Sequence, residues 1–153
     1  DWVVPACSPS LLVKHRLRQP ADILSLPLLS IEWERNSSIL PGWSEWAASI
    51  GAQYIRGSGE LTLSLSSAAI DAAVNGRGVV LAQMSMVADE IASGRLVVPF
   101  DQRLRLPEPY FLAWDRSTLE KPHGPELRAW LVAISKLQEI SSASWAPSAN
   151  SDG

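Results

Sequence analysis

The sequence predicts an α/β fold built on parallel strands, and three features of residues 61–100 indicate it. Residues 61–65 alternate leucine with small polar side chains, which is the period of a strand. Residues 79–82 are uniformly apolar, as in a strand covered on both faces. Two helical segments end at Asn75-Gly76 and Ser93-Gly94, where glycine can enter the left-handed conformation. Alternating strands and helices are typical of a parallel sheet covered by helices.

Serine residues stand where these two helices are expected to begin. Ser66 and Ser67 precede the first helix, and Ser85 precedes the second. A serine hydroxyl at this place accepts a hydrogen bond from the free N–H groups of the first turn. We therefore expect these serines to cap the helices. A last strand is expected at residues 96–98, just before Pro99.

The segment before residue 61 continues the same alternation. Residues 2–6 are predicted to form a strand, and Ser8-Pro9 opens a helix that continues through Arg16. A strand follows from Pro27. Residues 43–50 form a helix that ends at Gly51, and its two tryptophans, three positions apart, lie on one face and favour core packing.

The segment after residue 100 is predicted to be less regular. Residues 101–109 are charged and contain prolines, which is typical of a connector, and residues 110–114 follow as a strand. A helix from Pro125 to about residue 140 carries large apolar side chains on one stripe. These are Leu127, Trp130, Leu131, Ile134 and Leu137. Residues 141–153 offer too few packing groups and are expected to be disordered.

Composition excludes several classes of protein. The chain has 153 residues, 46% of them hydrophobic, which suffices for a buried core. A net charge of -3 and a pI near 5.3 are not those of a DNA-binding surface. The one cysteine, Cys7, cannot form an internal disulfide and is expected to be a packed thiol. With no apparent signal peptide or membrane-length apolar run, we expect a cytoplasmic protein with no membrane partner.

The residues do not favour an enzyme. His15 and His123 are far apart and lack a metal-ligand spacing, and Asp89-Glu90 are adjacent, so on a helix they diverge. No nucleophile-elbow or phosphate-loop motif occurs. We expect no catalytic residues, no metal and no cofactor.

A ligand-binding site is better supported. Ligands of parallel α/β folds bind beyond the carboxyl ends of the strands, where helix N-termini present N–H groups. Ser64, Ser66 and Ser67 cluster at the end of the strand 61–65. Three hydroxyls exceed what capping needs, although capping alone remains an alternative for each. We predict that they contact a small-molecule ligand.

Two motifs carry a family resemblance. Residues 72–82 read AAVNGRGVVLA, and residues 94–100 read GRLVVPF. Together with the sequence CSPSLL at residues 7–12, they resemble the effector-binding domain of LysR-type transcriptional regulators over residues 3 to about 140. The similarity is greatest to the branch that includes the glycine-cleavage activator and the β-lactamase regulator.

The resemblance implies a type 2 periplasmic-binding-protein-like effector domain, represented by its C-terminal part. Residues 1–106 would form the second lobe, 107–140 the return strand and last helix of the first lobe, and 141–153 a tail. Family members commonly place a serine or threonine against the effector at this strand end, where Ser64, Ser66 and Ser67 lie, and Tyr110 matches a position that can face the same cleft.

The resemblance also implies partners. Regulators of this family bind a small-molecule effector, form dimers and tetramers, and contact promoter DNA through an N-terminal helix-turn-helix domain that these residues lack. Two alternatives remain open: a solute-binding protein without DNA binding, and an enzyme on the same fold, which would need a catalytic threonine or cysteine set.

Overall fold

The computed structural model describes residues 1–32, 40–55, 57, 59–107 and 111–144. Within these ranges the chain forms two compact units. The first comprises Asp1–Pro107, and the second lies within residues 111–144. Each is described by itself.

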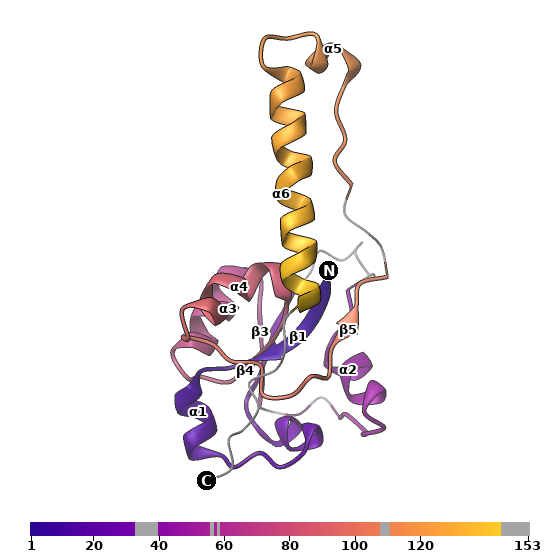
Figure 1. Cartoon of the computed structure of the whole chain (residues 1–153). Helices are drawn as coiled ribbons and strands as arrows, with labels where there is room; N and C mark the ends of the chain where they lie inside the picture. Colours follow the sequence, from indigo (N-terminus) through magenta and orange to yellow (C-terminus); the bar gives the residue numbers. More distant parts are fainter. Residues whose placement is uncertain (33–39, 56, 58, 108–110, 145–153) are drawn as a thin grey trace. The chain divides into compact units, whose positions relative to one another are not determined.

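The first unit is built on a five-stranded sheet in the order β3-β2-β4-β1-β5 (Figure 1). Its strands are β1 (Trp2–Ala6), β2 (Leu28–Ile31), β3 (Glu60–Leu63), β4 (Val79–Gln83) and β5 (Leu104–Arg105). β2 is parallel to both β3 and β4, which confirms the expected parallel core. β1 is antiparallel to β4 and to β5, so the sheet is mixed. The predicted parallel arrangement thus holds for β2, β3 and β4. The direction of β1 could not be predicted, because a local apolar pattern carries no information on strand direction.

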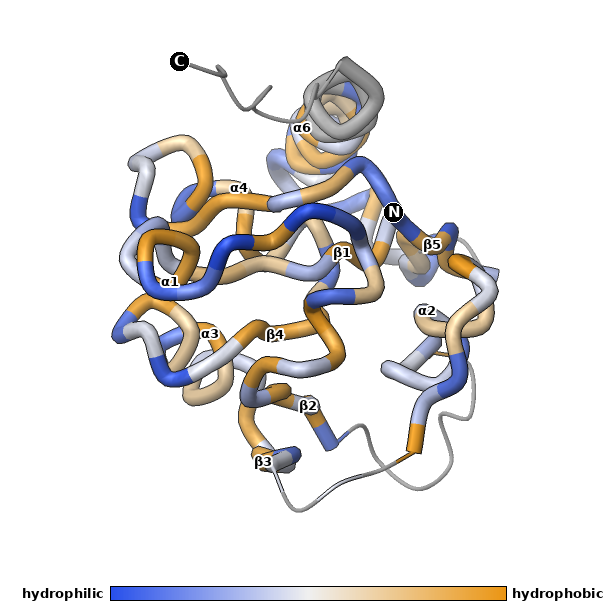
Figure 2. The backbone as a smooth tube through the Cα atoms, turned by 90° about the horizontal axis from the view of Figure 1, so that it is seen from below, coloured by the Kyte–Doolittle hydropathy of each residue, from blue (hydrophilic) through white to orange (hydrophobic). Residues whose placement is uncertain are grey.

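Five short helices surround this sheet: α1 (Pro9–Lys14), the 3-10 helix η1 (Pro20–Ser25), α2 (Trp43–Ser49), α3 (Ser66–Val74) and α4 (Met84–Ala92). α3 and α4 lie on one face of the sheet and α2 lies on the other (Figures 1 and 2). The predicted helix ends are confirmed at Gly51, Gly76 and Gly94, each of which has a φ near +70°. α1 ends earlier than expected, at Lys14, because His15 adopts an extended conformation.

The core is divided by the central strand β4, all five residues of which are buried. Val79 and Leu81 pack with Trp43 and Trp46 of α2. Alternate residues of a strand point to opposite faces, so Val80 and its neighbours face α3 and α4. Figure 2 shows apolar residues concentrated along β4. The expectation of a strand covered on both faces is confirmed, as is core packing for the two tryptophans.

The strand predicted at residues 96–98 was wrong. Residues 96–98 make only an isolated bridge, in which Cys7 and Val97 exchange backbone hydrogen bonds of 3.0 and 2.8 Å. Pro99 has no N–H to extend such a ladder. After residue 95, the segment that pairs with β1 as a strand is β5, which lies within the expected connector and has only two residues.

The second unit contains α5 (Arg116–Leu119) and α6 (Gly124–Ser144). Residues 111–114, expected as part of a strand, have no regular structure. The guanidinium carbon of Arg128 lies over the Trp114 ring, 4.8 Å from the ring centroid. An extended segment needs a neighbouring strand for its backbone hydrogen bonds, and the described part of this unit has none. α6 continues to Ser144, so the expected disorder was wrong for residues 141–144, and the rest of the tail lies outside the described residues.

Candidate effector-binding site

Three parallel strands end at the same edge of the sheet. β2 ends at Ile31, β3 at Leu63 and β4 at Gln83. α3 follows β3 and α4 follows β4, so both helices begin at this carboxyl edge. In a parallel α/β sheet this is the edge at which ligands bind.

All three predicted serines lie at this edge, around the N-terminus of α3. Ser64 is exposed in the link between β3 and α3, Ser66 is the half-buried first residue of the helix, and Ser67 is the exposed second residue. The structure therefore brings Ser64, Ser66 and Ser67 to one place, as expected from the order of the elements.

The serines do not cap α3, however, and the capping prediction was wrong. The N-cap residue is Leu65, which makes no side-chain cap. The N-cap side chain normally accepts a hydrogen bond from an N–H group of the first helical turn. A leucine side chain has no acceptor atom, so Leu65 cannot accept such a hydrogen bond. Within the described ranges, none of the three serine hydroxyls makes a hydrogen bond. This helix end combines N–H donors, three hydroxyls and the positive end of the helix dipole.

Leu65 itself adds an apolar surface to the same place, because 64% of it is exposed. Sequence reasoning treated it as one of the alternating residues of a strand and missed its position at the helix start. Gln83, a buried polar residue at the end of β4, was also missed. The sequence signal that could have indicated Gln83 is its position directly after the uninterrupted apolar run 79–82.

The N-terminus of α4 differs from that of α3. Ser85 is the second residue of α4 rather than its cap, so the capping prediction was wrong here too, and the N-cap residue is Gln83. The Ser85 hydroxyl and N–H both donate to the Asp1 carboxylate. A carboxylate already compensates the positive end of this helix.

Tyr110, the fourth predicted site residue, lies outside the described residues. Its contribution to the site therefore stays a prediction.

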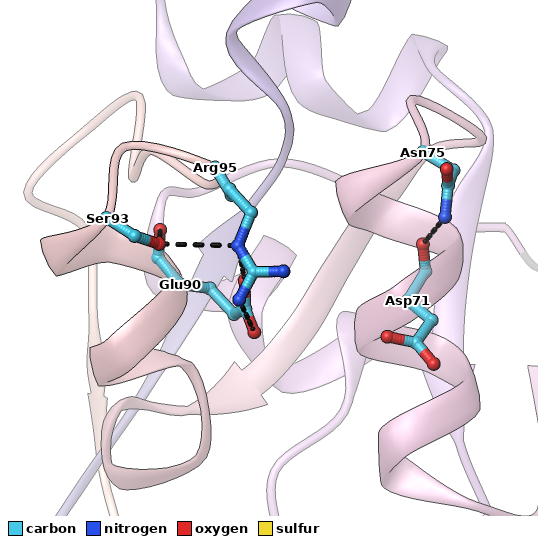
Figure 3. Close-up of polar contacts among 5 residues, drawn as sticks. All are labelled: Asp71, Asn75, Glu90, Ser93 and Arg95. Carbon is cyan, nitrogen blue, oxygen red and sulfur yellow. Dashed lines mark hydrogen bonds and ion pairs between the residues drawn. The ribbon is translucent and has the colours of Figure 1, made fainter.

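Asn75 and Arg95, one from each sequence motif, have structural roles at the ends of helices. Asn75 donates to the Asp71 carbonyl oxygen at 2.8 Å, which closes α3 (Figure 3). Arg95 pairs with both carboxylate oxygens of Glu90, at 2.8 and 2.7 Å, and closes α4. Glu90 is thus engaged in an ion pair at the end of α4.

The remaining ionisable candidates are also dispersed. His15 ends α1, and His123 precedes α6 with a φ of 64°; both side chains are exposed. Across the described ranges, no three His, Cys, Asp or Glu side chains are placed to hold a metal ion. No described helix has the length and apolar character needed to cross a membrane.

Cys7 is completely buried beside the isolated bridge to Val97. Burial raises the pKa of its thiol from 9.0 to about 12, because the thiolate would lose its hydration. The expectation of a packed, unreactive cysteine agrees with this environment.

Comparison with known proteins gives a consistent assignment. The family described as the LysR substrate binding domain matches residues 1–135. The glycine cleavage system transcriptional activator of Escherichia coli K12 is 30% identical over 134 residues, which is 87% of this chain and 42% of the relative. The transcriptional activator AmpR of Citrobacter freundii is 30% identical over 131 residues, covering 85% of this chain and 42% of that protein. The chain thus spans about two fifths of these relatives.

Solved structures agree with this assignment. The AmpR effector-binding domain of Citrobacter freundii superimposes with a TM-score of 0.62 at 25% identity, covering 87% of this chain and 62% of that one. The effector domain of AmpR from Pseudomonas aeruginosa superimposes with a TM-score of 0.66 at 22% identity, covering 94% of this chain and 66% of that one, and shares the fold. A variant of the Citrobacter freundii domain replaces a threonine, a serine and a tyrosine with residues that lack the hydroxyl group.

Proposed function

This chain belongs to the LysR substrate-binding domain family, and we propose that its effector binds at the carboxyl edge of the sheet, against the N-terminus of α3. The chain is part of the effector-binding domain of a LysR-type regulator, with the fold of the type 2 periplasmic binding proteins. In the proposed site, Ser64, Ser66 and Ser67 supply hydroxyl groups, and the role of Tyr110 stays a prediction.

The observation that carries this proposal is the leucine at the N-cap of α3. A protein that only needed a stable helix would gain about 1 kcal/mol from a serine, threonine or aspartate at this position. Leu65 leaves the first-turn N–H groups and the neighbouring hydroxyls to an outside partner. The chemistry favours an effector with an anionic or hydrogen-bond-accepting group, placed beside an apolar part that covers Leu65.

The substitutions in the solved AmpR variant support the choice of residue types. A serine and a tyrosine are among the residues that lose their hydroxyl groups in that domain. The predicted set here has the same two types. The relatives that match this chain are transcriptional regulators rather than enzymes.

For the whole protein we propose control of transcription. The AmpR relatives are named HTH-type transcriptional activators, and the shared domain would give the present protein an effector-dependent activity of that class. Promoter DNA would be bound by a helix-turn-helix domain outside these residues, in agreement with the acidic balance of this chain. Self-association as dimers and tetramers, and a cytoplasmic location, belong to the same proposal.

The alternative is a solute-binding protein that shares the fold but does not act on DNA. The family match and the names of the relatives favour the regulator. Footprinting of the full-length protein on the DNA upstream of its own gene distinguishes the two, because a solute-binding protein would protect no sequence.

The site is tested with the Ser66→Ala variant. A purified preparation is first examined by native mass spectrometry for a retained small molecule, and affinity for that molecule is then measured by calorimetry. Loss of one hydrogen bond predicts roughly two- to tenfold weaker binding. The matched control is Ser25→Ala, because Ser25 ends η1, before the amino end of β2, and donates only to the Asp22 carbonyl oxygen.

Equal affinities for the wild type and Ser66→Ala would reject the site. A similar loss in Ser25→Ala would show that the effect is one of general stability rather than of contact with the effector.

A further inference from the structure

We infer that Asp1 is a latch that couples the first turn of α4 to the point where the chain leaves the first unit. This inference goes beyond the proposed function and does not depend on the identity of any effector. It rests on two sets of contacts that Asp1 makes at once, one through its side chain and one through its backbone.

The side chain of Asp1 fixes the start of α4. One carboxylate oxygen, Oδ2, accepts hydrogen bonds from the Ser85 hydroxyl and from the Ser85 N–H, the latter at 3.4 Å. The other oxygen, Oδ1, accepts from the Trp2 N–H at 2.7 Å. Since Gln83 makes no side-chain cap, the carboxylate takes the role of a cap that comes from a segment 84 residues away.

The backbone of Asp1 holds a different segment. Its carbonyl oxygen accepts a hydrogen bond from the Leu106 N–H at 3.0 Å. Leu106 directly follows β5 and is buried, and Pro107 is the last residue of this part of the first unit. β5 itself pairs with β1 over only two residues, and the Asp1–Leu106 bond extends this pairing by one further position, beside the buried Leu106 side chain. Figure 2 shows the N-terminus close to β5.

These contacts link three places in the fold. α4 begins at the carboxyl edge of the sheet, Asp1 precedes β1, and Leu106 leads toward the second unit. A displacement of the first turn of α4 moves the Asp1 carboxylate, and through its backbone it loosens Leu106. The latch therefore gives events at the carboxyl edge a short covalent and hydrogen-bonded route to the exit segment.

Two alternatives at this place are less well supported. Ser85 could act as an ordinary surface serine, but both its hydroxyl and its N–H are engaged by one carboxylate. Asp1 could be a plain helix cap, but its backbone also continues the β1–β5 pairing to Leu106, so the residue that caps α4 is held in the same pairing as the exit segment. The coupling between the two contacts is the new claim.

The test measures amide hydrogen exchange by NMR on the 153-residue chain and on its Ser85→Ala variant. Removal of the hydroxyl weakens the hold on Asp1, and we expect exchange at Leu106 to accelerate about tenfold, as for the loss of one charge-assisted hydrogen bond. Ser93→Ala is the matched control at the other end of α4, where the hydroxyl donates to the Glu90 carbonyl oxygen at 3.1 Å. In that variant Leu106 should exchange as in the wild type.

A second variant, Asp1→Asn, keeps the size of the side chain and removes its charge. It should accelerate amide exchange at Leu106 in the same way. In the double variant, exchange at Leu106 should be no faster than in either single variant, because both substitutions break the same link. If Ser85→Ala folds poorly, Asp1→Asn alone carries the test.

Unchanged exchange at Leu106 in both variants would overturn the latch. Uniform acceleration over the whole first unit, seen equally with Ser93→Ala, would also overturn it, because that result indicates a loss of global stability without specific coupling.

Discussion

Gly78 lies directly before β4, close to the backbone of Pro27, which directly precedes β2. A Cβ atom at this position would lie 2.4 Å from the carbonyl oxygen of Pro27, which is itself bonded to the Val79 N–H at 2.9 Å. The glycine of the sequence motif is thus explained by a steric requirement at the start of the central strand.

We predict that Gly78→Ala destabilises the first unit by roughly 2–3 kcal/mol, because either the backbone of Pro27 or the strand must shift. The free energy of unfolding is measured by urea titration. Gly59→Ala is the control, since a Cβ there meets nothing within 4 Å. Equal stability of the two variants would contradict this explanation of the motif.

The burial of Cys7 leads to a second prediction at the scale of single residues. Because its pKa is raised to about 12, the thiol should resist iodoacetamide at pH 8 in the folded chain and react in urea. Labelling is followed by mass spectrometry. Equal rates with and without urea would show that the thiol is accessible.

The same shift has a consequence for stability at alkaline pH. The folded pKa is raised, so the contribution of the buried thiol is fully present below the unfolded pKa near 9.0. It is lost as pH rises toward 12, because the unfolded chain ionises first. A Cys7→Ala variant should lose less stability between pH 9 and 11 than the wild type.

At the scale of elements, α2 is the helix whose packing in the core was best predicted. Trp43 and Trp46 are three residues apart, and the structure packs them edge to face at 5.6 Å. Trp46 is fully buried, and its indole N–H donates to the Gln102 carbonyl oxygen at 3.1 Å. α2 therefore joins the core to the segment that leads into β5.

Truncation of this side chain should be costly. We predict that Trp46→Ala lowers the free energy of unfolding by roughly 3–5 kcal/mol, since it opens a cavity and leaves the carbonyl of Gln102 without its partner. Trp130→Ala, at a position 58% exposed, is the control and should cost much less. Thermal unfolding monitored by circular dichroism compares them, and similar losses would contradict the assigned burial.

The elements show why part of the fold could be predicted and part could not. Apolar runs and glycine stops are local signals, so β1, β4 and the ends of α3 and α4 were correctly placed. β5 has two residues and depends on pairing with β1, which no local pattern contains. The capping predictions failed for a related reason: a serine near a helix start was taken as the cap, whereas Leu65 and Gln83 hold those positions.

At the scale of the whole molecule, the sequence predicted the position of the candidate site better than the contacts around it. The order of strands and helices was enough to bring Ser64, Ser66 and Ser67 to one edge of the sheet. The engagement of Ser85 with Asp1 could not be predicted, because the two residues are 84 positions apart in the sequence and their contact depends on the antiparallel placement of β1.

The second unit leads to a prediction about association. Within this unit, α6 leaves large apolar side chains uncovered: Leu127, Trp130 and Ile134 are 53%, 58% and 38% exposed. They lie on one stripe of the helix. A large apolar side chain contributes about 1.5–3 kcal/mol when it becomes fully buried, so covering the exposed parts of all three is worth several kcal/mol. An apolar stripe of this kind is typical of an association site.

We therefore predict that the 153-residue chain self-associates through α6, and that its mean mass rises above 16.6 kDa with concentration. Light scattering after size-exclusion chromatography measures this mass. Trp130→Lys should shift the chain toward the monomer, because a charge in an apolar contact must be desolvated. Ala129→Lys is the matched control, since residue 129 lies on the side of α6 away from the stripe and is exposed. A mass that stays at that of the monomer over the whole concentration range would show the prediction wrong, and an equal effect of the two lysines would place the contact elsewhere.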